Sequence, residues 1–314
     1  MSSEAHINFT VRFDQPLVVW MLQLGGWLPL QFSTVAIVLV DRNVLKAIES
    51  LTANPGHPDL VVEQWWLSSL NSDRFALNAL PCAHEGDLRR IPSYQEFCAS
   101  LRASYEILAA GMPEARLIDH RQADLERVYE NVTATLARHE KESSFLVQVA
   151  PHLHARVSAA NAKKTELALL SAAQDADLDL CSLVVLAALS CLYEAQDGSE
   201  PMIGRRVIKP TPNYTQADAH NALSDLRSLE MLSLAIGLDG RSIGYCTRDK
   251  GLAAFWTYLR VSNPKWSGNK FSATLSPAEQ LFPRLGEAGV RDLLIRLRSA
   301  RSGCDPSHHR EESQ

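Results

Sequence analysis

The chain has 314 residues, of which 46% are hydrophobic and 21% are charged, with 15 Gly and 15 Pro. These values exclude a disordered, collagen-like or low-complexity protein, and the length suits one large domain or two modest ones. The net charge of −5 excludes a polycationic nucleic-acid coat, although residues 201–300 carry 14 Lys and Arg against 8 Asp and Glu. This basic third is where a polyanion would bind, and chance clustering on a solvated surface is the alternative.

The cysteines and the long uncharged segment favour a cytoplasmic protein without membrane association. The six Cys form no C-x-x-C pair, so we expect reduced thiols rather than a disulfide framework or zinc ribbon. Residues 15–40 carry no charge, but Gly25 and Gly26 lie among polar residues near their middle, which a lipid-facing span tolerates poorly. Acidic Glu4 and Asp14 argue against a secretory signal. We expect buried strands joined by a turn at Gly25 and Gly26.

Two hydrophobic patterns predict strands near the start of the chain. Residues 6–13 alternate apolar and polar side chains, as in a half-buried strand towards a sheet edge. Residues 35–40 are continuously apolar and β-branched, which is typical of a central parallel strand covered on both faces. This run ends at Asp41, and the residues after it have helical spacing up to a break near residues 54–56.

The middle of the chain reads as mainly helical. Residues 57–140 are charged and have helical spacing, so we expect a helical insertion in a single α/β domain over residues 1–300. Residues 145–150 have the composition of a further strand. A helical hairpin is expected next, with helices over about 160–174 and 179–195.

The last third is better punctuated. Thr215 is predicted to cap a helix that runs to about Leu238 and stops at Gly240, with Asp218 completing a capping box. Beyond this helix we expect a strand over residues 242–246, a helix from residue 249, a helix over 276–300 and a disordered polar tail over 301–314.

Two acids occupy matching positions in this pattern. Asp41 and Asp249 each directly follow an apolar run that reads as a strand, and each precedes a helix. The carboxyl ends of parallel strands form the ligand-binding edge of such a sheet, so neighbouring strands would direct both carboxylates into one cleft. Asp218, Asn221 and Asp225 share one helix face and would border the same cleft.

Clustered carboxylates suggest a metal site. Their mutual repulsion raises their pKa values unless a cation lies between them, and oxygen ligands without His or Cys select Mg²⁺ or Mn²⁺. Such ions can activate water and stabilise the leaving oxygen in phosphodiester cleavage. Each acid has a structural alternative, since Asp218 completes the capping box and Asp41 and Asp249 are placed to cap helices. For Asp225 the alternative is a solvated helix face.

The motifs resemble those of a known family. The string NALSDLRSLEML, followed by YCTRDKGL, resembles the C-terminal half of a PIN-like domain, in which an Asp on a helix precedes a strand ending in Thr/Ser-x-Asp. The string VAIVLVDRNVL resembles the first motif of that family, a hydrophobic strand that closes on an acid. The resemblance covers residues 34–50 and 205–260. It implies a Rossmann-like three-layer α/β sandwich with a central parallel sheet and the activity of a metal-dependent ribonuclease or structure-specific nuclease.

The resemblance also assigns roles to residues. It implies catalytic acids at Asp41, Asp225 and Asp249, which bind the metal, and at a further acid between the first and third motifs. Glu166 is our choice for that acid, and Glu63 and Glu96 are the alternatives. Thr247 would support the metal site through a hydrogen bond, with Asn221 and Asp218 beside it.

Basic residues flank these motifs and would bind phosphates, unless they form a plain solvated face. They are Arg205, Arg206, Lys209, Arg248 and Lys250. We therefore expect a cytoplasmic endoribonuclease, acting on RNA or single-stranded nucleic acid, in which water is the nucleophile. The main alternative is a catalytically inactive PIN-like binding or scaffold module, whose helical insertion engages a protein partner or inhibitor. A phosphatase-like or nucleotide-binding α/β protein is a third option, but the chain has no Gly-rich phosphate loop.

Overall fold

The computed structural model describes residues 12–86, 88–134, 136–197, 202–239, 242–268 and 270–302. Six strands in this part of the chain form a sheet of order β2-β1-β6-β3-β4-β5. They are β1 (Trp20–Gln23), β2 (Gly26–Leu28), β3 (Ile37–Val40), β4 (Ala76–Asn78), β5 (Arg116–Leu117) and β6 (Ile243–Thr247). A separate hairpin joins β7 (Val261–Ser267) to β8 (Lys270–Leu275).

The sheet is mainly parallel. β5, β4, β3 and β6 run in one direction, whereas β1 pairs antiparallel with both β6 and β2. β3 lies between β4 and β6, with Val38 opposite Leu77 on one side and Gly244 on the other. A Cβ at Gly244 would lie 2.7 Å from the Met21 sulfur, so a glycine is needed where β1 approaches β6.

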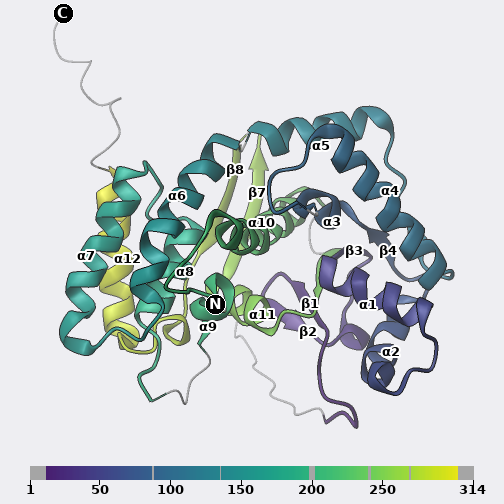
Figure 1. The fold of residues 1–314 in the computed structure, drawn as a ribbon, viewed down its shortest axis with the longest axis horizontal. Helices are drawn as coiled ribbons and strands as arrows, with labels where there is room; N and C mark the ends of the chain where they lie inside the picture. The colour runs from purple at the N-terminus through teal and green to yellow at the C-terminus, as the bar shows by residue number, and fades with distance from the viewer. Residues whose placement is uncertain are drawn as a thin grey trace, which may run out of the picture.

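Helices cover both faces of the sheet. Side chains alternate along β3, so Val38 and Val40 enter one buried core and Leu39 enters the other. The first core is covered by α1 (Arg42–Ala53), α2 (Val61–Leu67), α3 (Leu80–Glu85) and α4 (Tyr94–Gly111). Figure 1 shows these helices on one side of the molecule and α6 to α8 with α12 on the other.

The second core is the larger one and lies under the later helices. These are α6 (Leu136–Leu153), α7 (Ala159–Asp175), α8 (Leu183–Leu192), α9 (Ile203–Ile208), α10 (Gln216–Asp239), α11 (Lys250–Leu259) and α12 (Gly286–Ser302), and α5 (Gln122–Ala134) precedes them. None of the described helices is long and apolar enough to cross a membrane.

Most of the predicted elements are confirmed. The uncharged segment forms β1 and β2 around a turn, the β-branched run forms β3, and α1 ends at Ala53. The hairpin of α7 and α8, the helix α10 and the pair β6 and α11 are present. The capping box is also present, since the Thr215 amide donates to the Asp218 carboxylate at 2.8 Å and the Asp218 amide donates to the Thr215 hydroxyl at 3.3 Å.

Three predictions are wrong. Residues 145–150 lie in α6, because Phe145, Leu146 and Val149 are spaced to bury one face of a helix. The segment 57–140 is mainly helical as expected, but it is not an insertion, because it supplies β4 and β5 to the central sheet. The last helix begins at Gly286, ten residues later than expected. Most of the strand predicted over residues 6–13, Gly240 and the tail from residue 303 lie outside the described residues.

Candidate functional site

Two of the predicted acids lie at the same edge of the sheet. Asp41 follows β3 and Asp249 follows β6, and these strands are parallel neighbours. Asp41 is 5% exposed, and the Asp249 side chain is 20% exposed. Each acid follows the carboxyl end of its strand, where ligands bind in open α/β sheets. The negative charge of Asp249 contributes to a raised pKa of Asp41, whose main cause is burial.

Thr247 connects these two acids. Its hydroxyl donates to the Asp41 carboxylate at 2.5 Å and accepts from the Asp249 amide at 3.0 Å. Asp41 stands at the N-cap position of α1, but its side chain makes no capping hydrogen bond. Asp249 caps α11 with one oxygen, which accepts from the Leu252 amide at 2.9 Å. Thr247 therefore orients a carboxylate that has no capping role.

Asp225 projects towards the same place from α10. Burial raises its pKa well above the ordinary value, and the charges of Asp249, Asp41 and Glu85 raise it further. Lys209 has the opposite effect, since its ammonium lies 3.7 Å from the Asp225 carboxylate and 3.6 Å from that of Asp249. The structure therefore brings Asp41, Asp225 and Asp249 near one another, with the Lys209 ammonium beside Asp225 and Asp249.

Glu85 is the fourth acid of this group, and the sequence reasoning missed it. It ends α3, directly after β4, and its pKa is raised by burial and by the charge of Asp41, against the effect of Arg42 and Lys46. The strand before it has three residues, too few to show a hydrophobic period. A prediction of β4 as a strand would have pointed to Glu85. This acid ends the short helix after that strand and therefore lies near the same edge of the sheet as Asp41. We call Asp41, Glu85, Asp225 and Asp249 the acid cluster.

Glu166 does not belong to the acid cluster, which corrects our prediction. It lies in α7, fully buried, and accepts hydrogen bonds from Arg296, Tyr193 and Lys163. Figure 1 shows α7 and α12 at the end of the molecule remote from β3 and α1. Burial of this carboxylate is compensated by two cations and a hydroxyl, so its role is to join α7 to α12.

The two alternatives to Glu166 also have structural partners. Glu63 accepts from the Arg248 guanidinium at 2.5 Å. Glu96 completes a capping box at the start of α4 and pairs with Arg90. Asp218 likewise serves the capping box of α10, and Asn221 is exposed one turn before Asp225.

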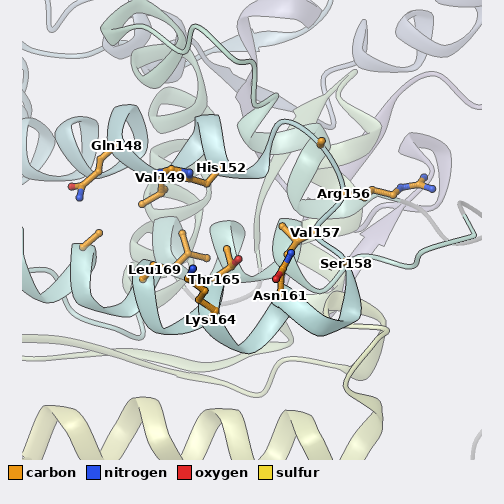
Figure 2. A pocket seen from close by; sticks show the side chains of 13 residues that line it. Gln148, Val149, His152, Arg156, Val157, Ser158, Asn161, Lys164, Thr165 and Leu169 are labelled. Atoms are coloured by element: carbon orange, nitrogen blue, oxygen red, sulfur yellow. The ribbon is translucent and has the colours of Figure 1, made fainter.

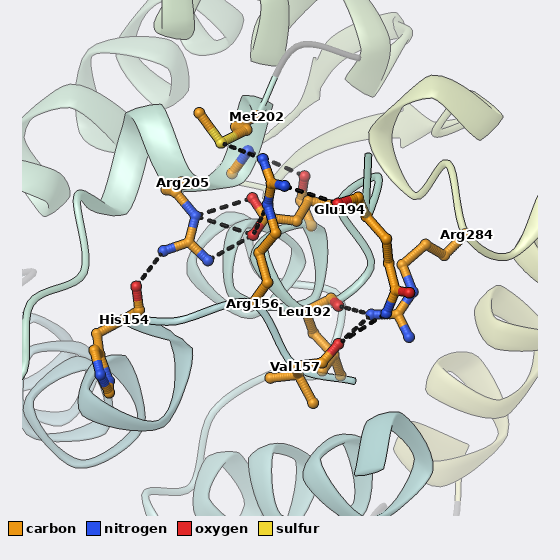
Figure 3. Close-up of polar contacts among 11 residues, drawn as sticks. His154, Arg156, Val157, Leu192, Glu194, Met202, Arg205 and Arg284 are labelled. Atoms are coloured by element: carbon orange, nitrogen blue, oxygen red, sulfur yellow. Dashed lines mark hydrogen bonds and ion pairs between the residues drawn. The ribbon is translucent and has the colours of Figure 1, made fainter. Parts of the chain in front are cut away.

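Arg205 is engaged inside the protein rather than offered to phosphates, as Figure 3 shows. Its guanidinium donates to both oxygens of Glu194, at 2.6 to 3.0 Å, and to the backbone oxygen of His154 at 2.8 Å. Glu194 is 3% exposed, so it needs this pairing. Our prediction that Arg205 binds phosphates is therefore wrong, because its guanidinium is already paired with Glu194. Arg206 and Lys250 are exposed, and Arg248 is shared with Glu63.

The donor chemistry of the acid cluster suits a hard divalent cation such as Mg²⁺ or Mn²⁺, because every donor is a carboxylate. In the arrangement described, Lys209 stands close to two of these carboxylates. Among the residues that the structure describes, no three His, Cys, Asp or Glu side chains are grouped so as to hold a metal ion. The carboxylates of the cluster are donors of a type that suits such an ion, but binding one would require their side chains to move closer together around Lys209.

The cavity of about 650 Å³ between α6 and α7 lies apart from this chemistry (Figure 2). Its lining includes His152, Asn161, Lys164 and Thr165 but none of the acid cluster.

Comparison of the chain with protein-family models, curated proteins and solved structures found no match. The assignment of a function therefore depends on the geometry of the site.

Proposed function

We propose that this chain is a PIN-like nuclease that uses Mg²⁺ or Mn²⁺ to cleave RNA or single-stranded nucleic acid. The observation that carries the proposal is the convergence of four acids at one edge of a parallel sheet, two that follow β3 and β6 and two that lie in α3 and α10. Grouping partly buried carboxylates destabilises a fold, and such groups are concentrated at functional sites. The order of the acids along the chain agrees with the resemblance once Glu85 replaces Glu166 between the first and third motifs.

Each residue has a defined part in this proposal. Asp41, Asp225, Asp249 and Glu85 would hold the cation, and Thr247 would fix the orientation of Asp41. A bound divalent cation would supply an activated water and stabilise the leaving oxygen. Arg206 and Lys250 would contact the phosphates of the substrate.

A second candidate is a PIN-like module that binds a partner without catalysis. The observation in its favour is Lys209, whose ammonium already partly neutralises Asp225 and Asp249. In this candidate the acid cluster is a structural ion-pair network, and a protein partner or inhibitor would dock on the helices of residues 57–140. This candidate predicts that the chain cleaves no nucleic acid with any metal.

The first prediction tests the proposed site by cleavage of a fluorescent single-stranded RNA with Mg²⁺, with Mn²⁺ or with chelator. Asp41→Asn and Asp249→Asn should each lower kcat by at least about 100-fold, because each removes a negative charge that the cation requires. Glu106→Gln is the matched control, since this carboxylate is exposed on α4. Circular dichroism would verify that each variant is folded.

Two results would contradict the proposal. Metal-dependent cleavage that survives unchanged in both Asn variants would exclude this site. A folded wild-type chain that cleaves no RNA with either metal, and binds neither, would favour the binding module.

A further inference from the structure

Lys209 has an unusual place in the molecule. Its ammonium lies within 4 Å of two members of the acid cluster, at 3.6 Å from Asp249 and 3.7 Å from Asp225. Its side chain is nevertheless 62% exposed, so the charged end reaches the acids from the rim of the site rather than from the core. A long side chain in this position can leave the acids without unpacking its own helix.

The backbone of Lys209 is held in a conformation that few residues other than glycine adopt. Its φ of 54° and ψ of 52° place it in the left-handed region, where it ends α9. Its amide donates to the Arg205 oxygen at 2.8 Å, and the buried Tyr214 hydroxyl donates to the Ile208 oxygen at 3.0 Å. This backbone geometry fixes the point from which the Lys209 side chain extends towards the acid cluster.

The helix that carries Lys209 is tightly fixed. A Cβ at Gly204 would lie 2.5 Å from the Ala187 oxygen and 2.6 Å from the Cys191 nitrogen, so α9 lies directly on α8. Arg205 adds its hydrogen bonds to the buried Glu194 (Figure 3). The Cα of Lys209 is therefore anchored, while its exposed side chain is free to change direction.

An ammonium and a divalent cation cannot both stand between Asp225 and Asp249 without strong repulsion at such distances. We propose that Lys209 is the resident counter-ion of the acid cluster and that a divalent cation binds only by displacing its ammonium. This inference rests on the proposed function, because it concerns how that site takes its metal. The displaced ammonium stays at the rim, where the phosphate of a substrate is its natural partner.

The test is calorimetric titration of the full chain with Mn²⁺ alone. Lys209→Gln should bind Mn²⁺ at least about tenfold more tightly than the wild type, because the competing charge is gone. Lys209→Arg keeps the charge and should stay within about threefold of the wild type. Lys46→Gln is the matched control, because Lys46 is an exposed lysine of α1 whose charge acts on Glu85.

The outcomes separate this inference from the proposed function. Equal Mn²⁺ affinity in the wild type and Lys209→Gln would overturn the competition and leave the metal site intact. An equal gain in Mn²⁺ affinity in Lys46→Gln would also overturn the competition, since removal of any nearby positive charge would then explain the gain. Absence of Mn²⁺ binding in every variant, Lys209→Gln included, would overturn both.

A double-mutant cycle in urea gives a readout that needs no metal. Lys209→Gln should lower the unfolding midpoint in the wild type and have a smaller effect in the Asp225→Asn background, because the ion pair is already broken there. The same effect in both backgrounds would show that the ammonium does not interact with Asp225, and would overturn its role as counter-ion.

Discussion

Asp225 is a residue whose charge the fold disfavours. Its side chain is 26% exposed, and burial together with three neighbouring acids raises its pKa well above 3.8. A carboxyl with a raised folded-state pKa binds its proton more tightly in the folded state than in the unfolded state. Its contribution to the free energy of unfolding is therefore lost as pH rises from 3.8 through the raised pKa, and its charge destabilises the protein at neutral pH.

The second prediction follows for the variant Asp225→Asn. Removing the charge should increase the free energy of unfolding by about 1 kcal/mol at pH 7 while abolishing the proposed cleavage. Urea unfolding at pH 7 and at pH 4 measures the first effect, and the gain should shrink at the lower pH, where Asp225 is increasingly protonated. A variant that is less stable than the wild type at pH 7 would contradict this account.

At the scale of elements, the packing of α9 on α8 determines where Lys209 lies. The third prediction is that Gly204→Ala lowers the free energy of unfolding by about 2 kcal/mol. The added methyl group would clash with backbone atoms of α8, which cannot move without shifting the helix. Differential scanning calorimetry would measure the loss. Gly289→Ala in α12 is a suitable comparison, because its Cβ would meet only the Leu285 side chain, at 3.1 Å and beyond. Similar losses in both would argue against a tight α8 and α9 contact.

A cluster of three histidines lies where α3, α6 and α10 meet. His84, His139 and His220 lie near the buried Arg227, and the rings of His139 and His220 are 5.6 Å apart. Burial, and then the charge of Arg227, lowers the pKa of His84 to about 4 and that of His139 to about 3. The charged groups on this cluster also include Arg138 and Glu142 of α6, and Glu142 pairs with Arg138. The histidines are therefore neutral in the folded protein at neutral pH.

The fourth prediction concerns the stability of the protein at acidic pH. A histidine whose folded pKa is below 6.5 binds protons preferentially in the unfolded state, so its stability contribution is complete above pH 6.5 and decreases as pH falls towards the folded value. These histidines should lower the free energy of unfolding by about 2 kcal/mol between pH 6.5 and pH 5, against the opposite effect of Glu142, whose pKa is raised by burial to about 6. His139→Gln should reduce this slope, as urea unfolding across that range would measure. An unchanged slope would show that these histidines are not its cause.

For the molecule as a whole, the two cores explain why the sheet edge can carry charge. The sheet is covered on both faces by apolar side chains, so the acids can be presented at the strand ends without interrupting either core. The hairpin of β7 and β8 rests on α10, where the Trp266 indole donates to the Leu234 oxygen at 3.2 Å. Helix α10 therefore connects the hairpin, the larger core and Asp225.

The sequence by itself determined the elements whose signals are local. The β-branched run of β3, the capping box of α10 and the strand-terminal positions of Asp41 and Asp249 could be read because hydrophobic period and capping depend on near neighbours. The tertiary structure decided which charges meet. β4 and β5 have three residues and two, too short to show a period, so Glu85 was missed. Glu166 meets Arg296, and Lys209 meets Asp225 and Asp249, through packing of elements distant in the chain, which no local pattern encodes.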